Sequence, residues 1–180
     1  MNPASIVNFG EVANGTAING TTIKGFTFSE NVASAAVASS AAGPGNTNHI
    51  TGQVALSSGS VSLPSNYALT IGMPGAVTSF GFGYALNSFT PLANGITITL
   101  FDGVTNLGSL PFNAGLDPTF AGGFAGIGST DPFTRAVITF ASTVPNFAID
   151  NVAAVSAIPE PGTALFGLGL MGVAMMRRRR

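Results

Sequence analysis

The sequence predicts an all-β protein, an antiparallel β-sandwich of jelly-roll type, followed by a C-terminal hydrophobic helix. Strong helix formers such as Lys and Glu are scarce, whereas Gly, Thr, Val and Phe are abundant. Turn dipeptides such as Asn14-Gly15 and Asp102-Gly103 recur between short apolar runs. Residues 157–180 differ from all of this, because they form an apolar stretch that ends in arginines. We therefore divide the chain into a β-sandwich body, residues 1–156, and a tail, residues 157–180.

The clearest predicted strand is residues 96–101, where apolar side chains alternate with threonines. Successive side chains of a strand point to opposite faces, so one face of this strand should lie in the core. Similar runs occupy residues 22–28, 53–56, 60–63, 68–71, 77–84, 136–140 and 147–155. About eight such strands suit two sheets packed face to face. The residues that we expect to be buried are Ile96, Ile98, Leu100, Ile138, Phe140 and Ile149.

Two segments carry no clear strand pattern. Residues 31–48 are rich in Ala, Ser and Gly, and they predict a weak helix or a loop. Residues 112–132 contain closely spaced glycines, and they predict a second long loop.

Charge and cysteine content exclude several classes of function. Residues 1–158 contain two basic and six acidic side chains, which leaves no basic surface for phosphate contacts. Nucleic acid is therefore not an expected partner. The absence of cysteine excludes disulfides, thiolate metal sites and a cysteine nucleophile. Residues 1–9 show neither the basic nor the apolar region of a signal peptide. Either export is a wrong inference or the chain is mature or truncated at its start, and we favour truncation or a misassigned start.

The tail has three parts in a fixed order. Pro159, Glu160 and Pro161 interrupt both helices and strands and form a stiff linker. Residues 162–176 are uncharged and predict a short membrane helix, because they have no polar face and the arginine stems that follow can reach the headgroups. The anchor residues are Gly162, Leu165, Phe166, Leu168, Leu170, Met171, Val173, Met175 and Met176. The basic cluster is Arg177, Arg178, Arg179 and Arg180, which the positive-inside bias places in the cytoplasm.

This order resembles the PEP-CTERM sorting signal of Gram-negative bacteria. The resemblance implies export to the cell envelope or surface and transient anchoring in the inner membrane. It also implies cleavage near the motif by an exosortase-type enzyme and an origin in bacteria that make exopolysaccharide, which is a candidate partner. The body also resembles, more loosely, domains that are often found ahead of such tails. The similarity lies in three short sequence patterns, at residues 9–16, 25–28 and 147–151.

Catalysis has weak support in the sequence. His49 is the only histidine and no Gly-x-Ser-x-Gly motif is present, so a Ser-His-Asp triad is not expected. Gly167, Gly169 and Gly172 match a dinucleotide fingerprint by letter, but they lie in the apolar tail and follow no strand. We predict a protein that is not an enzyme, with a loop role for His49.

Calcium is the ligand that the acidic residues suit best, since it needs only carboxylate and carbonyl oxygens. Glu11 and Asp150 would supply the carboxylates if the first and last strands are neighbours. The other interpretation is that both are ordinary turn carboxylates. No further cofactor is predicted.

The functional hypothesis is a surface or extracellular-matrix protein, structural or adhesive, linked to exopolysaccharide or biofilm. A carbohydrate-binding module is the alternative, and an exported hydrolase comes third. Carbohydrate-binding faces usually offer Trp or Tyr platforms, whereas this chain has no Trp and only Tyr67 and Tyr84. We therefore expect most of its phenylalanines to lie in the core.

Overall fold

The computed structural model describes residues 6–41, 44, 47–57 and 63–156. Within this part of the chain the fold is all-β and antiparallel, as predicted, and no α-helix is present. The strands are β1 (Ile6–Val7), β2 (Thr22–Ile23), β3 (Phe26–Glu30), β4 (Ala35–Ser39), β5 (Gln53–Ser57), β6 (Ala68–Leu86), β7 (Leu92–Asp102), β8 (Thr105–Leu116), β9 (Ala121–Phe140) and β10 (Phe147–Ser156).

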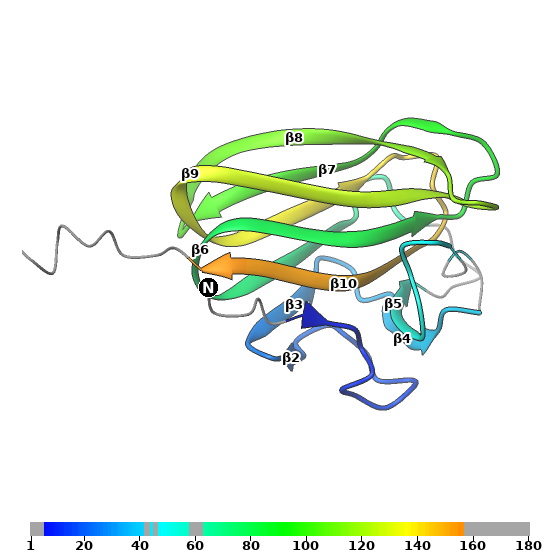
Figure 1. The fold of residues 1–180 in the computed structure, drawn as a ribbon, viewed down its shortest axis with the longest axis horizontal. Coiled ribbons are helices and arrows are strands. Elements are labelled where there is room, and N and C mark those ends of the chain that lie inside the picture. Colours follow the sequence, from blue (N-terminus) through cyan, green and yellow to red (C-terminus); the bar gives the residue numbers. More distant parts are fainter. Residues whose placement is uncertain (1–5, 42–43, 45–46, 58–62, 157–180) are drawn as a thin grey trace, which may run out of the picture.

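Two long strands, β6 and β9, connect the two layers of the sandwich (Figure 1). The first part of β6, residues 68–72, pairs with β3 and with the last part of β9, which also pairs with β7. After a register shift between Gly72 and Ser79, β6 pairs with β10 on one side and with residues 121–128 of β9 on the other. One layer therefore contains β4, β5, β10, the second half of β6 and the first half of β9. The other contains β3, the first half of β6, the second half of β9, β7 and β8. A single sheet thus folds over onto itself.

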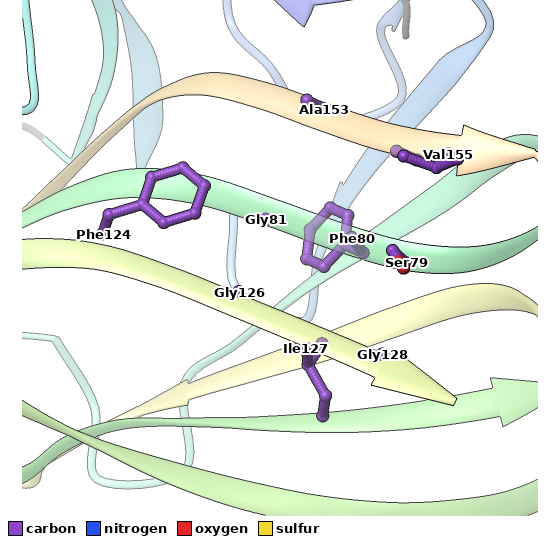
Figure 2. Close-up of a pocket in the computed structure, with 10 residues that line it drawn as sticks. Ser79, Phe80, Gly81, Phe124, Gly126, Ile127, Gly128, Ala153 and Val155 are labelled. Atoms are coloured by element: carbon purple, nitrogen blue, oxygen red, sulfur yellow. The ribbon is translucent and has the colours of Figure 1, made fainter. Parts of the chain in front are cut away.

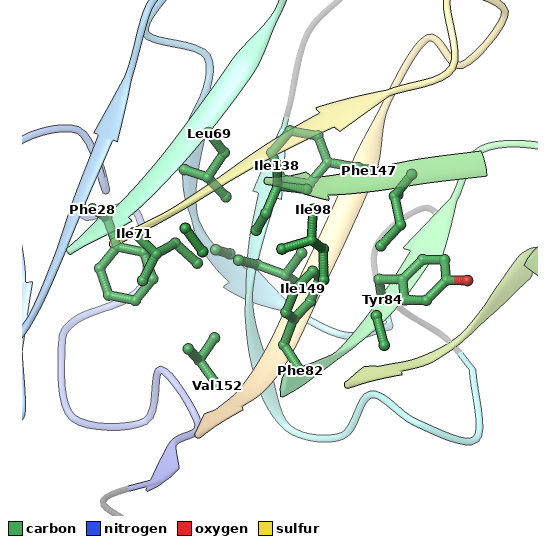
Figure 3. Packing of buried hydrophobic residues seen from close by; sticks show 14 of the residues in the cluster. Phe28, Leu69, Ile71, Phe82, Tyr84, Ile98, Ile138, Phe147, Ile149 and Val152 are labelled. Carbon is green, nitrogen blue, oxygen red and sulfur yellow. The ribbon is translucent and has the colours of Figure 1, made fainter. Parts of the chain in front are cut away.

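The core lies between these layers (Figure 3). Ile96, Ile98 and Leu100 are buried, while Thr97 and Thr99 are partly exposed, which confirms the predicted alternation. Ile138 and Ile149 are buried as expected. Phe140 is only half-buried, but its ring stacks on Phe147 at 4.2 Å between centroids. The phenylalanines expected in the core are mostly there, including Phe9, Phe26, Phe28, Phe80, Phe82, Phe133 and Phe147. Tyr67 and Tyr84 are buried as well.

Both predicted loops contain strands. Residues 31–48 include β4, which consists mostly of small residues. β4 pairs with β5 along its full length. Residues 112–132 include the end of β8 and the first half of β9, so the prediction of a long loop there was wrong. The glycines of β9 add little intrinsic strand preference, but hydrogen bonding to β6 holds them in the sheet. Of the predicted strand at 60–63, only Leu63 is among the described residues, and it lies outside any strand.

The last described strand ends at Ser156, and the tail lies outside the described residues. Within the described ranges, no helix is long and apolar enough to cross a membrane.

Candidate functional site

A shallow apolar trough crosses the outer face of β10, β6 and β9 (Figure 2). It encloses about 360 Å³, near the lower end of the usual range for ligand sites. Its lining comes from residues 79–81 of β6, from Phe124 and residues 126–128 of β9, and from residues 153–155 of β10. None of these residues is charged, and Ser79 supplies the only polar side chain.

The trough exists because alternate residues of the neighbouring strands are small. Gly81 lies opposite both Gly126 and Ala153, and Ser79 lies opposite Gly128 and Val155. Directly opposed residues of antiparallel strands share a face, so these side chains all point outward. The intervening Phe80 points inward, where its ring lies 5.5 Å from that of Phe82. Because phenylalanine alternates with glycine along this part of β6, the phenylalanine rings fill the core, and the glycine leaves a hollow on the outer face.

Phe124 lies over this glycine floor. A methyl group at Gly81 would come within 2.8 Å of the Phe124 ring, and one at Gly126 within 3.2 Å. The ring therefore covers the backbone at two glycines, and Figure 2 shows it lying across β6 beside Gly81. The side chain nevertheless remains 57% exposed. This combination gives an aromatic ring whose position is fixed by contact below and whose other side is open to solvent.

Residues 47–51, which we call the strap, cross the same outer face next to the trough. The carbonyl of His49 lies so close to Gly83 that a methyl group there would overlap its oxygen. On the β10 side, the Thr51 amide donates to Asp150 Oδ2 at 3.0 Å, and Asn151 Nδ2 donates to the His49 carbonyl at 3.3 Å. Gly83 is the register partner of Phe124, so the strap stands at the Phe124 end of the trough.

The other side of the strap is held by Asp117. The side chains of His49 and Asp117 form a hydrogen bond through Nδ1 and Oδ2, and the Asn48 amide donates to the Asp117 carbonyl at 3.3 Å. Asp117 is nearly buried, whereas the His49 ring is about half exposed. The sequence analysis assigned His49 an unspecific loop role, and this pairing was missed because 68 residues separate the two partners.

Beneath the strap, Ile50 covers a small second apolar cluster. It packs with Val54, Leu56, Ala85 and Ala148 on the outer face of β5, β6 and β10. Ile50 is almost fully buried as a result. The strap therefore divides this outer face into a covered half and the open trough.

The two predicted calcium carboxylates lie in different environments. Glu11 forms an ion pair with Lys24 at 2.5 Å. Burial raises the pKa of Glu11, but the hydrogen bond and charge of Lys24 together with backbone hydrogen bonds outweigh it, so the net pKa lies below the ordinary value. Asp150 is fully buried, which raises its pKa to about 6, and the negative charge of Glu11 adds to this. Its oxygens accept hydrogen bonds from the amides of Thr51 and Asn151.

No group of three or more His, Asp or Glu residues is positioned to hold a metal ion in the part of the chain that the structure describes. The carbonyl oxygens of Phe9 and Val12, near Glu11, have a hydrogen-bond donor of their own. The side-chain amide of Gln53 lies 2.8 Å from the carbonyl oxygen of Phe9 and 3.0 Å from that of Val12, and its nitrogen can donate to both. The calcium site at Glu11 and Asp150 stays a prediction.

Beyond the described residues, the chain matches a known sorting signal. Residues 157–180 match the PEP-CTERM protein-sorting motif, which covers the whole tail. The chain is a PEP-CTERM-containing protein. This identification confirms the resemblance drawn from Pro159, Glu160, Pro161 and the arginine cluster, and it marks the protein for export to the cell envelope or surface. The individual roles of the tail residues stay predictions.

The body of this PEP-CTERM protein is similar in structure to several bacterial and other β-sandwich domains. A cleaved adhesin domain of Lys-gingipain matches with a TM-score of 0.56 and 13% identity, over 87% of this chain and 100% of that chain. A mutant of a family 29 carbohydrate-binding module gives 0.47 and 8%, over 88% and 96%. A family 32 module of C. perfringens NanJ in complex with galactose gives 0.44 and 15%, over 77% and 97%. No curated protein matches the sequence significantly.

At these sequence identities the structural similarities are evidence for the fold alone. The evidence comes from the adhesin domain, whose TM-score is 0.56. The PEP-CTERM protein therefore has a β-sandwich body, in agreement with the sequence prediction.

Proposed function

We propose that this PEP-CTERM protein is a non-catalytic, adhesive component of the bacterial surface or extracellular matrix, and that it binds exopolysaccharide through the trough. The sorting motif supports the location, because it directs the body out of the cytoplasm. An exported, cysteine-free sandwich with few charges suits a role in contact with neutral polymers. The links to biofilm and to a particular polysaccharide are part of the proposal.

The observation that carries the binding proposal is the Phe124 ring. A sugar ring presents a face of C–H groups that packs against an aromatic ring, while its hydroxyls remain in water or bond to nearby polar groups. Phe124 is exposed on one side and supported by Gly81 and Gly126 on the other, so little side-chain freedom is lost on binding. The hydroxyl of Ser79, two residues from Gly81 along β6, can hydrogen-bond to a sugar hydroxyl.

Replacement of Phe124 tests this proposal. The full-length protein, kept in mild detergent, should co-sediment with exopolysaccharide purified from the bacterium that makes it. Phe124→Ala should weaken binding by about 10- to 30-fold, as expected when an aromatic anchor is removed from a binding site. Phe89→Ala is the matched control, because Phe89 is 66% exposed but pairs with Phe120 in a loop away from the trough. Equal binding by wild type and Phe124→Ala would refute the use of the trough.

We also propose that the tail acts as a transient anchor in the inner membrane until an exosortase-type enzyme removes it. The apolar anchor from Gly162 to Met176 and the arginines after it support this role. In the native host, the mature protein should lack the residues from Arg177 onward, and replacement of Pro159, Glu160 and Pro161 by alanine should abolish the size change. Mass spectrometry that finds Arg177–Arg180 on soluble surface protein would contradict the proposal.

A carbohydrate-binding module that recognises a defined sugar is the second candidate, and the small volume of the trough favours it. A glycan array separates the two. Strong binding to one sugar epitope would favour the module, whereas weak binding to many neutral polymers would favour general adhesion.

A further inference from the structure

The trough is bounded by the strap at one end, and this restricts how a polymer can lie in it. Along β6, the strap crosses at Gly83, two residues from Gly81 in the trough. In the other direction the lining stops at Ser79 and Val155, near the end of β10. We propose that the trough binds the terminal residue of a neutral glycan chain, with the chain leaving past Val155. This inference rests on the proposed function of the trough.

The strap is an effective end wall because three separate contacts hold it. It bonds to Asp150 on β10 and to Asp117 beyond β8, so both of its sides are fixed. Between these attachments, Ile50 is buried in the cluster beneath it. A ligand could displace the strap only by exposing Ile50 and breaking both attachments, which would oppose binding. A glycan lying along the strands therefore has to end at the strap.

The orientation of Phe124 agrees with this geometry. Phe124 is opposite Gly83, yet its ring lies over Gly81 and Gly126, one residue pair further from the strap. The space above Gly83 is occupied by the carbonyl of His49. The aromatic platform and the wall are thus adjacent, and a sugar ring that stacks on Phe124 has the strap directly beyond it.

The size and charge of the trough fit one or two neutral sugar rings. Successive outward residues of a strand are separated by roughly 6–7 Å, and the lining extends over one such step along β6 and two along β9. No charged side chain lines it, so an acidic terminal sugar or a phosphate has no counter-charge there. The ligand that this site fits is the uncharged end of a chain.

Partial acid hydrolysis of the exopolysaccharide tests the inference, because it creates chain ends at constant mass. The full-length protein should bind the hydrolysed material more tightly per unit mass, in proportion to the number of ends. Binding per chain end should stay constant as the average chain becomes shorter. Binding that depends only on polysaccharide mass would overturn the chain-end inference and leave the proposed exopolysaccharide function intact. Loss of all binding, with both materials, would contradict the proposed function itself.

Variants of the strap provide the second measurement. Gly83→Ala would push the His49 carbonyl away from β6, and His49→Ala would remove the bond to Asp117 without a change in the sheet. If either variant folds, its preference for chain ends should fall at least severalfold as the wall opens. Gly115→Ala is the control, because a methyl group there meets no atom within 4 Å. An unchanged preference in folded His49→Ala would overturn the role of the strap.

A second copy of the chain is the alternative occupant of an exposed apolar face. Light scattering distinguishes it from a glycan. A dimer that Phe124→Ala dissociates would overturn the glycan-end inference, whereas a monomer with an open trough supports it.

Discussion

The outer face of one sheet has a covered half and an open half, although both halves have small residues on the same strands. In the covered half, Ala85 and Ala148 leave room for Ile50 of the strap, which seals the surface. In the open half, Gly81 and Ala153 leave similar room, but only Phe124 lies across it. Small side chains on a sheet face thus create space, and the segment that crosses the face decides whether that space adds stability or stays available to a ligand.

The largest predicted difference between the halves is in stability. Ile50→Ala removes the side chain that seals the covered half, and it should destabilise the protein by about 2–4 kcal/mol, as large-to-small changes at buried sites do. Val155→Ala is the matched change in the open half. Since Val155 is 48% exposed, its effect should remain within about 0.5 kcal/mol. Urea denaturation of both variants measures the contrast, and similar values for the two would show that the halves do not differ in stability.

This contrast also shows what could be predicted from sequence. Residues 96–101 were predicted correctly because their apolar and polar residues alternate, and the pattern alone decides which face is buried. The first half of β9 was missed because its glycines suggested a loop. A signal was present, however, since Ala125 and Ile127 alternate with Gly126 and Gly128, which is the period of a strand that is larger on one face than on the other.

The strap could not be predicted, because nothing local specifies it. His49 and Asp117 are 68 residues apart, and Thr51 and Asp150 are 99 residues apart. Neither segment has a periodic pattern, so only the folded sheet brings the partners together. Phe124 likewise has no sequence feature that separates it from the core phenylalanines, since its exposure follows from the face of β9 on which it lies.

The boundary between the halves should respond to pH through Asp150. Burial raises the pKa of this carboxyl to about 6 in the folded protein from an ordinary value of 3.8, so the folded state holds the proton more tightly than the unfolded state. The contribution of Asp150 to stability is therefore greatest below about pH 4. It should fall by up to about 3 kcal/mol as the pH rises from about 4 to 6, and it should stay level above pH 6, where the buried carboxylate is ionised.

Asp150→Asn isolates this effect. The asparagine side chain keeps an oxygen that can accept the hydrogen bond from the Thr51 amide, and it does not ionise in this pH range. In EDTA, the stability difference between wild type and Asp150→Asn should change across pH 4–6 and level off above it. A stability difference that is independent of pH would show that folding does not change the pKa of Asp150. Ionisation of Asp150 would then have no effect on stability.

Contact between the strap and β6 should be sensitive to a single methyl group. Gly83→Ala forces an overlap with the His49 carbonyl and should cost about 1–3 kcal/mol, the usual range for overpacking. Gly128→Ala, in the trough, meets its nearest atoms at 3.6 Å and should be close to neutral for stability. Thermal denaturation compares the two variants, and a neutral Gly83→Ala would mean that the strap moves away from the sheet at little cost.

The smallest predicted effect is that of calcium, at the point where the last strand meets the strap. Burial raises the pKa of Asp150, and the negative charge of Glu11 adds to this; Ca²⁺ bound near both carboxylates would offset that charge. Binding to the folded state alone stabilises it by mass action. With a dissociation constant in the millimolar range typical of extracellular modules, 5 mM is a suitable test concentration, and the gain should be about 1 kcal/mol, or a rise in Tm of roughly 2–4 °C.

Mg²⁺ should give less, because it requires a smaller and more regular set of ligands. Asp150→Asn and Glu11→Gln should each reduce the rise, whereas Asp131→Asn, in the exposed middle of β9, should keep it. An unchanged Tm in wild type would remove the calcium prediction, and the Lys24 ammonium would then be the cation that balances Glu11.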